Sequence, residues 1–326
     1  MKRAQLKYGI ISSLALLSFG FLPLAHAQEN YPNRVVRIIV PFPPGSILDG
    51  LTRIVSEGLS KKWSQSVIVE NVSGAGGNIG TYKFAQSPPD GYTLIAAPPG
   101  PFTINRLLFD KLNYDASTFK PITIMGTVPA ALVVRKDFPA KDLEGFISYA
   151  RANPGRISYG SQGIGTSSFL TAKLLESRAN VEMLHVPYRG SSSALSDIIS
   201  GDVDCIFDAL SNAVSMERQG NIRILAITDL NRSEALPTAP TVMETLPGFL
   251  AVSWFALAAP AGTPNVLLSR ISSDVQEIIN TPEINRRLRD IGLTPGKGTP
   301  EIAAKFIADE DAIWSTLIRE IGLKPQ

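Results

Sequence analysis

The sequence predicts an α/β fold with mixed, mostly parallel sheets. Short runs rich in β-branched and aliphatic residues alternate with amphipathic runs along residues 35–321. The order of strand, small-residue turn and helix recurs from residues 35, 67 and 157. Parallel strands need such a crossover, so this recurrence favours parallel pairing.

Each predicted element rests on a local pattern. Leu48, Leu51 and Val55 recur at helical spacing, while Thr263-Pro264 and Thr299-Pro300 each place a capping hydroxyl before a proline that starts a helix. Predicted strands cover residues 35–40, 66–72, 93–97, 122–134, 157–159, 183–186, 205–207, 222–228 and 252–259. Predicted helices cover residues 48–62, 143–152, 167–178, 194–200, 264–280 and 300–321.

No linker rich in glycine, serine or proline divides the chain into successive domains. If the chain forms two lobes, we expect its backbone to cross between them near residues 122–134 and 228–253. The predicted organisation is a discontinuous first lobe, residues 28–126 plus 251–326, and a second lobe, residues 127–250.

The N-terminus has the pattern of a secretory signal peptide over residues 1–27. Lys2, Arg3 and Lys7 precede an apolar run, and Ala25-His26-Ala27 fits the A-x-A cleavage pattern. A transmembrane anchor is the alternative, but the apolar run at residues 10–24 is short for the roughly 20 residues that a span needs. We therefore expect a periplasmic protein that begins at Gln28.

Composition excludes several kinds of chemistry. After residue 27, 28 basic residues face 29 acidic ones, with no basic run interleaved with aromatics, so neither nucleic acid nor a membrane surface is supported as a partner. Cys205 is the only cysteine and alternates with Val203 and Phe207, which predicts a buried, inert thiol and no intrachain disulfide. His185 is the only histidine after residue 27, so we expect no metal site and no cofactor.

The first strand runs through the turn Pro41-Phe-Pro-Pro-Gly45 into a helix that is predicted to begin near Ser46. The first N–H groups of a helix lack partners within it and attract anions, including carboxylates. Ser46 and Asp49 form a predicted capping pair, although Asp49 alternatively accepts from a ligand amine or hydroxyl. Several such helix starts predict a cleft for a small molecule.

A second small-residue turn, Gly74-Ala-Gly-Gly-Asn-Ile-Gly80, superficially resembles a dinucleotide fingerprint. Its G-x-G-x-x-x-G spacing is weaker than G-x-G-x-x-G, and the next strand offers no acidic residue for a ribose. The turn is therefore predicted either to bring amides near a small ligand or to allow close packing.

A third turn, Gly160-Ser-Gln-Gly-Ile-Gly-Thr-Ser-Ser168, is rich in hydroxyls. Ser161 with His185 raises the hypothesis of a nucleophile and its base, but the local order differs from the G-x-S-x-G elbow. Hydrogen bonding to a ligand is the favoured hypothesis; it involves Ser161, Gly163, Gly165, Thr166 and Ser167.

Asp208 ends a predicted strand at the edge where α/β sheets usually bind ligands. It either orients a ligand, bridges the lobes or caps a helix that begins near Asn212. Apolar turn residues either line a wall of the cleft or pack in the ordinary way; they are Phe42, Pro43, Pro98, Pro99 and Phe102.

These segments resemble the substrate-binding receptors of the tripartite tricarboxylate transporter family, often called Bug receptors. The ordered series is specific, and it covers nearly the whole chain after residue 27. Its first half comprises Tyr31-Pro32 with Arg34, Ile39-Val-Pro-Phe-Pro-Pro-Gly45 with Asp49, Val69-Glu-Asn71, Gly74-Ala-Gly-Gly77 with Ile79-Gly80, and Pro89-Asp-Gly-Tyr-Thr-Leu94. Its second half comprises Asn153-Pro-Gly155, His185-Val-Pro-Tyr188 with Gly190, Phe207-Asp208, Leu236-Pro237 with Pro240-Thr241, Ala259-Pro-Ala-Gly-Thr-Pro264 and Pro282-Glu283.

The resemblance implies a two-lobed, type II-like periplasmic binding protein, a monomer that closes a cleft on its ligand and delivers it to a membrane permease without catalysis. Main-chain amides and ordered water of two loops are implied to hold a ligand carboxylate. The candidate ligand-binding residues are Phe42, Pro44, Gly45, Ser46, Asp49, Pro98, Ser161, Gly163, Gly165, Thr166, Ser167 and Asp208.

Departures from the family pattern bear on the ligand. Ser46 stands where a second glycine is usual, Phe169 where a histidine is frequent, and Ala97-Pro-Pro-Gly-Pro-Phe102 where relatives commonly carry hydroxyls. Among the amino-acid, carboxylic and nicotinate-type ligands of the family, an aromatic or dicarboxylic acid is therefore favoured over citrate. Two alternatives stay open: an orphan ligand-sensing partner of a membrane signalling protein, and a secreted serine hydrolase.

Overall fold

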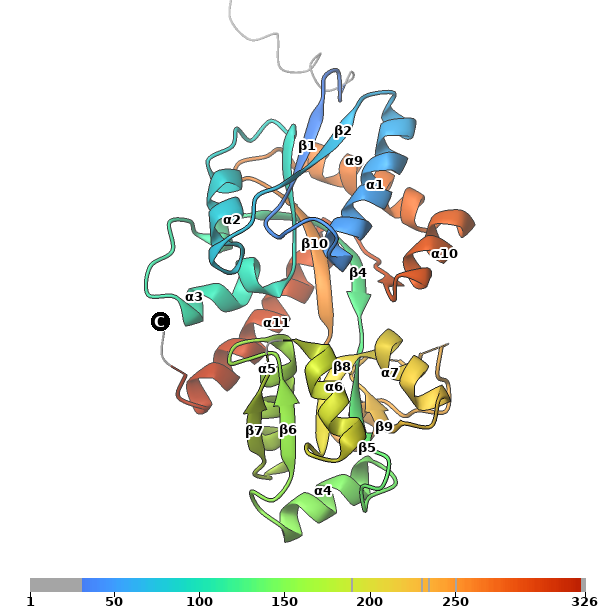
Figure 1. The fold of residues 1–326 in the computed structure, drawn as a ribbon. Coiled ribbons are helices and arrows are strands. Elements are labelled where there is room, and N and C mark those ends of the chain that lie inside the picture. Colours follow the sequence, from blue (N-terminus) through green and yellow to red (C-terminus); the bar gives the residue numbers. More distant parts are fainter. Residues whose placement is uncertain (1–30, 189, 230, 234, 250, 324–326) are drawn as a thin grey trace, which may run out of the picture.

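The computed structural model describes residues 31–323 except 189, 230, 234 and 250, so the predicted signal peptide lies outside the described residues. The chain forms two lobes, each built on its own sheet with helices on both faces (Figure 1). The α/β class and the two-lobed architecture are as predicted.

The first sheet has six strands in the order β11-β4-β10-β3-β1-β2. Its strands are β1 (Val36–Val40), β2 (Val67–Asn71), β3 (Thr93–Ala97), β4 (Lys120–Val128), β10 (Ser253–Ala259) and β11 (Thr294–Pro295). The second sheet has five strands in the order β7-β6-β8-β5-β9. Its strands are β5 (Ala130–Arg135), β6 (Ser158–Ser161), β7 (Leu184–Pro187), β8 (Cys205–Ala209) and β9 (Ile222–Ile227).

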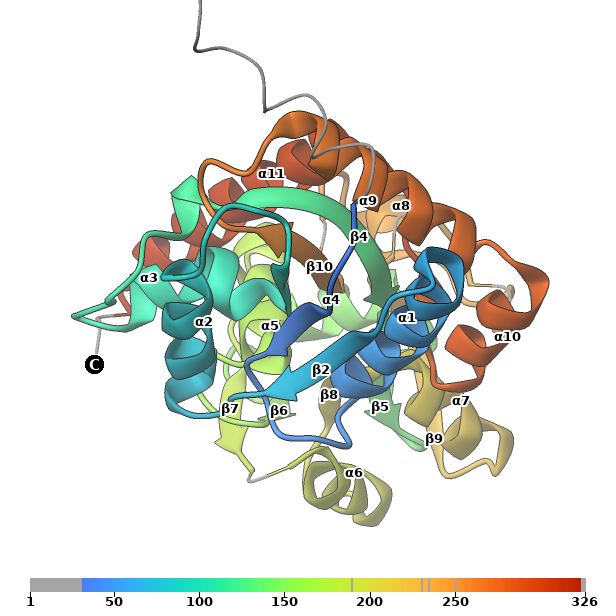
Figure 2. The same cartoon turned by 90° about the horizontal axis from the view of Figure 1, so that it is seen from above.

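Helices cover the six-stranded sheet on both faces (Figure 2). One face packs against α1 (Ile47–Trp63), α9 (Asn265–Ile279) and α10 (Pro282–Asp290). The other packs against α2 (Asn78–Ala85), the π-helical turn η2 (Gly100–Ile104) and the first half of α11 (Pro300–Glu320). Short elements complete this part: η1 (Ala75–Gly77), α3 (Asn105–Leu108) and η3 (Ala116–Thr118).

The five-stranded sheet is likewise covered on both faces. One face packs against α4 (Leu143–Ala152), α5 (Ser167–Ala179) and α8 (Val242–Thr245). The other packs against α6 (Ser191–Ser200) and α7 (Leu210–Arg218).

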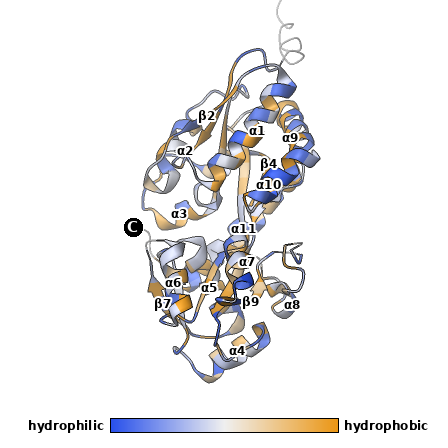
Figure 3. Cartoon of the chain, turned by 45° about the vertical axis from the view of Figure 1, so that its right-hand side comes forward, coloured by the Kyte–Doolittle hydropathy of each residue, from blue (hydrophilic) through white to orange (hydrophobic). Residues whose placement is uncertain are grey.

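The hydropathy colouring shows that β4 is largely hydrophobic, whereas the surface helix α10 is largely hydrophilic (Figure 3). In the described part of the chain, no helix is both long and apolar enough to cross a membrane.

The sheets are mixed, but the expectation of mostly parallel pairing is wrong. Among the described residues, parallel pairs join β1 to β2 and β3, and β6 to β7 and β8. Antiparallel pairs join β10 to β3 and β4, β11 to β4, and β5 to β8 and β9. The strands next to the crossings between lobes run in the opposite direction to the neighbouring strands of the strand–helix units, and this direction accounts for the antiparallel pairs.

The chain passes between the lobes at three places. The single strand predicted at residues 122–134 is two strands, β4 and β5, which meet at Pro129 and belong to different sheets. The chain returns between β9 and β10, and α11 then spans both lobes. On α11, Ala303 packs in the core of the first sheet, and Trp314 packs in the core of the second. The exact lobe boundaries remain a prediction.

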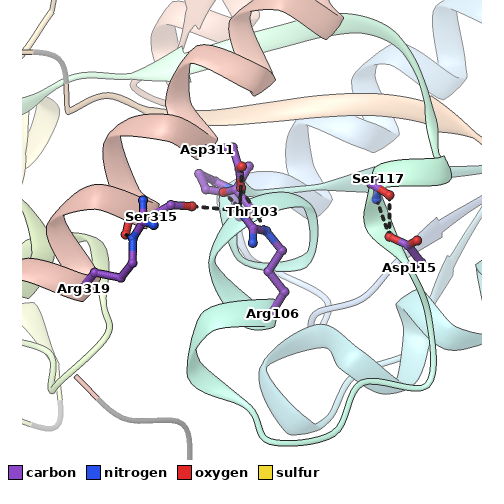
Figure 4. A network of polar contacts seen from close by, with 8 residues as sticks. Thr103, Arg106, Asp115, Ser117, Asp311, Ser315 and Arg319 are labelled. Carbon is purple, nitrogen blue, oxygen red and sulfur yellow. Dashed lines mark hydrogen bonds and ion pairs between the residues drawn. The ribbon is translucent and has the colours of Figure 1, made fainter. Parts of the chain in front are cut away.

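Residues 100–108 are helical and comprise η2 and α3. Ile104 packs in the core of the second lobe, and Leu107 and Leu108 pack against the same core, whereas Phe102 packs in the first lobe. Arg106 anchors this segment on α11 with a bidentate ion pair to Asp311, at 2.6 Å, and a 2.8 Å bond to Ser315 (Figure 4). The predicted start at Pro264 shifts, because Pro264 is itself the N-cap of α9 and the Thr263 hydroxyl donates to the carbonyl of Pro260 instead. Pro300 begins α11 as predicted, but its N-cap Thr299 forms no side-chain capping bond, so both predicted capping hydroxyls are wrong.

Substitution of Gly80 tests the close packing of α2 on β1. A Cβ at this position would lie 2.4 Å from the carbonyl oxygen of Val72 and 2.9 Å from Cα of Pro41. We expect Gly80→Ala to lower the free energy of unfolding by about 1–3 kcal/mol in urea titrations, because the backbone at Val72 and Pro41 must move to make room for the new methyl group. Gly50→Ala is the matched helical control, because its Cβ would meet only Ile291, at 3.7 Å. That control should gain about 0.5–1 kcal/mol, and equal effects of the two substitutions would contradict the packing argument.

Candidate functional site

The turn from β1 into α1 is held by the carboxylate of Asp49. Ser46 caps the helix by accepting the Asp49 amide at 3.2 Å, as predicted. The Asp49 carboxylate points back and accepts the Gly45 amide at 2.9 Å. Arg53 donates to the same carboxylate at 3.0 Å, and so does the side chain of Asn71 on β2. Asn71 also donates to the carbonyl of Phe42 at 3.1 Å, so β2 fixes both ends of the turn.

These bonds define the electrostatics of Asp49. The residue is 4% exposed. Burial alone would raise the pKa of its carboxyl, but hydrogen bonds from Arg53, Gly45 and Asn71 bring that pKa below its ordinary value. The carboxylate is thus ionised and accepts three hydrogen bonds, and its structural role is to shape the start of α1.

Within the glycine-rich turn, Gly77 and Gly80 are closely packed, whereas Gly74 and Gly76 are exposed, so the alternative of amides near a ligand stays a prediction. Gly74, Gly76 and Gly77 all have positive φ, and Gly77 lies against Phe42 and Pro101. The Asn105 side chain donates to the carbonyl of Gly76 at 3.0 Å, which ties the segment after β3 to this turn.

The proposed apolar wall is only partly available. Phe102 is buried in the first lobe against Phe119 and Trp254, so ordinary packing is the correct alternative for this residue. Phe42 and Pro98 are half-buried, whereas Pro43 and Pro44 are exposed.

The loop from β6 into α5 is organised by its own hydroxyls. Thr166 is the N-cap of α5 and also donates to the carbonyl of Gly163 at 2.6 Å. Ser168, which the sequence did not single out, accepts the Gln162 amide at 3.1 Å. Gly163 and Gly165 both adopt positive φ, and Ser167 is exposed at the first position of the helix.

Ser161 and His185 are brought together, but their surroundings differ from those of a catalytic pair. Ser161 Oγ lies 2.6 Å from Nε2 of His185 and accepts the Gly163 amide at 3.0 Å. Ser161 is 0% exposed, and no described carboxylate bonds the imidazole of His185. The ring stacks on Tyr159 at 5.0 Å. Burial, and then the charge of Lys173, lower the pKa of His185, so its ring is neutral and positions the loop.

Asp208 is the penultimate residue of β8, close to the predicted strand end, and is buried. The hydroxyl of Ser191, at the start of α6, donates to it, as does the side chain of Asn212 at 3.3 Å. The next helix, α7, begins at Leu210 rather than near Asn212 and has no side-chain cap. Asp208 therefore joins the starts of α6 and α7.

The two lobes touch beside these loops. A Cβ at Gly165 would lie 2.8 Å from Cδ1 of Leu108, and Ser167 Oγ lies 3.5 Å from Ser253 Oγ. The lobes also touch at a second place, where a Cβ at Gly292 would lie 2.6 Å from Ser211 Oγ. Between the described residues of the turn at 42–49 and those of the loop at 161–167, no hydrogen bond is formed. Each loop is stabilised chiefly within its own lobe.

The described residues gather no group of histidine, cysteine, aspartate or glutamate that could hold a metal. A surface hollow of about 420 Å³ lies at Arg34, Arg37, Lys83 and Tyr92, and none of the predicted site residues lines it. Cys205 is buried in β8, and burial keeps the pKa of its thiol well above the ordinary value, so the thiol is inert as predicted.

Two lobes joined by crossing strands, with helix starts at their adjoining ends, define the fold of a periplasmic binding protein. The model described as "Tripartite tricarboxylate transporter family receptor" matches residues 51–323. The chain therefore belongs to this receptor family, which confirms the resemblance. Members of this family and fold are solute-binding receptors.

Three similar proteins illustrate the relationship. The "UPF0065 protein in tcbD-tcbE intergenic region" of Pseudomonas sp. strain P51 is 35% identical over 96% of this chain and 94% of its own length. The structure of R. palustris Rpa4515 with adipate is 34% identical, with a TM-score of 0.73 over 91% of this chain and all of that one. The structure of MatC from Rhodopseudomonas palustris with bound malate is 31% identical, with a TM-score of 0.69 over 88% and 100%.

Sequence reasoning missed the partners that hold the predicted residues. Asn71 and Ser191 lie far along the chain from the carboxylates that they bind, so no local spacing marked them. The ion pair between Arg53 and Asp49 could have been predicted, because Arg53 follows Asp49 by four residues on one helix.

Substitution of Asp49 tests the turn through its pH dependence. The folded pKa lies below the unfolded value, so the stabilisation is present above about pH 4 and is lost as pH falls. We expect Asp49→Asn to unfold more readily than wild type in urea at pH 7, and the gap should narrow below about pH 4. Asp110→Asn, at an exposed position, is the control and should match wild type throughout. A difference in stability between wild type and Asp49→Asn that is constant with pH would show that the charge of Asp49 does not stabilise the turn.

Proposed function

We propose that the protein is a periplasmic receptor that captures a small carboxylate, of the aromatic or dicarboxylic class, for the permease of a tripartite tricarboxylate transporter. It acts as a monomer after loss of residues 1–27. Ligand binding favours a closed arrangement of the lobes, so recognition shifts a population between conformations.

The starts of α1 and α5 carry this proposal. Each helix follows the end of a strand through an exposed small-residue turn, and each is capped by a hydroxyl, Ser46 or Thr166. Helix starts attract carboxylates through free N–H groups and the helix dipole, at about 0.3–2 kcal/mol each. Micromolar binding, roughly −8 kcal/mol, therefore also requires other contacts and apolar burial.

The ligand class rests on the loop chemistry and on the relatives. The turns at residues 42–49 and 161–168 contain no lysine or arginine. The neighbouring segment is Ala97-Pro-Pro-Gly-Pro-Phe102, with few side-chain donors and half-buried Pro98. Two similar proteins were solved with dicarboxylates, adipate and malate. A carboxylate held by backbone amides with apolar surroundings is consistent with each of these observations.

Catalysis forms no part of the proposal. A nucleophilic serine must reach its substrate, whereas Ser161 has no exposed surface and its oxygen already accepts the Gly163 amide. We expect Ser161→Ala to loosen the loop without abolishing ligand binding, and we expect no turnover by wild type.

Thermal unfolding with candidate acids tests the proposal. A ligand that binds only the folded state raises the melting temperature further as its concentration increases. We expect dose-dependent shifts with adipate, malate or an aromatic acid such as benzoate, and smaller shifts with citrate. A shift with citrate alone would overturn the ligand class but keep the receptor, and no shift with any acid would contradict carboxylate capture.

A charge added at the start of α5 tests the role of that helix. We expect Ser167→Asp to weaken binding of the acid found by the screen about tenfold in calorimetry, equivalent to about 1.4 kcal/mol, because its carboxylate competes for the same N–H groups. Folding should be maintained, since an acidic residue stabilises a helix start. Asn265→Asp, which makes the same kind of change at the start of α9, is the matched control and should leave affinity unchanged. Equal losses in both variants would exclude a local effect.

A further inference from the structure

A buried carboxylate lies in the middle of α11, between the cores of the two lobes. Glu310 is 0% exposed, and its Oε2 accepts the indole N–H of Trp254 at 3.1 Å and that of Trp314 at 2.9 Å. Its Oε1 has no hydrogen-bond partner among the described residues. A buried, ionised carboxylate with an unpaired oxygen is costly, so this group favours either protonation or access to water.

The two indoles lie in different cores. Trp254, near the start of β10, packs with Phe102 and Phe306 in the first lobe. Trp314 follows Glu310 by one helical turn and packs with Leu317 in the core of the second lobe. Because β10 and α11 both lie where the chain passes between lobes, Glu310 helps to seat one crossing segment on another.

Burial raises the pKa of Glu310 to about 7, although the bonds from Trp314 and Trp254 lower it, and nearby Asp309 raises it further. Asp309 is paired with Lys305 at 2.7 Å. Asp311, the residue after Glu310, is paired with Arg106 of α3 (Figure 4). Asp311 is therefore compensated by Arg106, whereas Asp309 still raises the pKa of Glu310 despite its exposed pair with Lys305, and burial is the largest effect.

The other elements packed against α11 add little charge. The η2 and β10 segments contain no ionisable residue, and β4 contains only Lys120, which is exposed at its start. On α5, Lys173 pairs with Glu176 at 2.6 Å. On α9, Arg270 lies over Tyr31, and Asp274 and Glu277 contact Lys62.

We propose that Glu310 is a positioning residue whose protonation sets how firmly α11 is seated on β10, and thereby the relative placement of the two lobes. When the carboxyl is protonated, the dry arrangement described above is favoured. When it ionises, Oε1 requires water or a donor, which favours a looser crossing and a greater separation of the lobes. This inference does not depend on which ligand the receptor binds.

Indole resonances of the full mature chain labelled with ¹⁵N-tryptophan test the titration directly. The N–H signals of Trp254 and Trp314 should move together with a midpoint near pH 7. Trp63, which donates to Asp274 at 2.7 Å, is the internal control and should not follow that midpoint. Glu310→Gln should abolish the common titration, because its amide oxygen accepts hydrogen bonds but does not ionise.

A second variant covers the case in which Glu310→Gln folds poorly. Asp309 is exposed and raises the pKa of Glu310 through its charge. Asp309→Asn should therefore shift the common midpoint to lower pH. An unchanged midpoint, or independent midpoints for the two indoles, would overturn the assignment.

Distances between spin labels test the coupling to the lobes. Labels at Gln86→Cys in the first lobe and Ala152→Cys in the second occupy exposed positions, while Cys205 is buried. In the absence of ligand, we expect the distance distribution to shift to longer values as pH rises through 7, and we expect Glu310→Gln to remove that shift. A distribution that is constant with pH, or an equal shift in Glu310→Gln, would overturn the proposal.

Discussion

The packing of α11 into two cores is the constraint on which the rest of the architecture depends. The chain leaves the first sheet through β4 and returns through β10, and α11 then places Ala303 in one core and Trp314 in the other. Ile104 adds a second apolar tie, and Arg106 anchors its segment on α11 through Asp311. These contacts bring the adjoining ends of the two sheets together, and the helix starts at those ends become parts of one candidate site.

Each turn in that site is held by a buried polar group that forms at least two hydrogen bonds within its own lobe. Asp49 binds Gly45, Arg53 and Asn71, while Ser161 binds Gly163 and His185. These side chains shape the turns, and the proposed recognition of a carboxylate falls to backbone amides. An amide site does not require a buried cation, which is costly without a partner, and it tolerates changes of the surrounding side chains. This physical logic suits a receptor family whose solved relatives were found with different dicarboxylates.

The same crossing contains a buried carboxylate whose hydrogen bonding is incomplete. Glu310 accepts both indoles on one oxygen, while the other oxygen has no described partner. Its energetics differ from those of Asp49. Both carboxylates are buried, but both oxygens of Asp49 accept hydrogen bonds, one of them from a guanidinium, whereas only one oxygen of Glu310 does. One therefore rigidifies a turn, whereas the other links the crossing to proton binding.

The sequence by itself determined the α/β class, most strands and long helices, the capping pair at Ser46 and Asp49, and the family. These features depend on local periodicity, turn chemistry and the order of motifs, all of which are encoded over short distances. Only the tertiary structure decided the antiparallel pairings beside the crossings, the division of residues 120–135 between two sheets and the burial of Phe102. It also decided the pairing of Asp49 with Asn71 and of Glu310 with Trp254, which are 22 and 56 residues apart. Such contacts form when separate elements pack, so no spacing within a single segment specifies them.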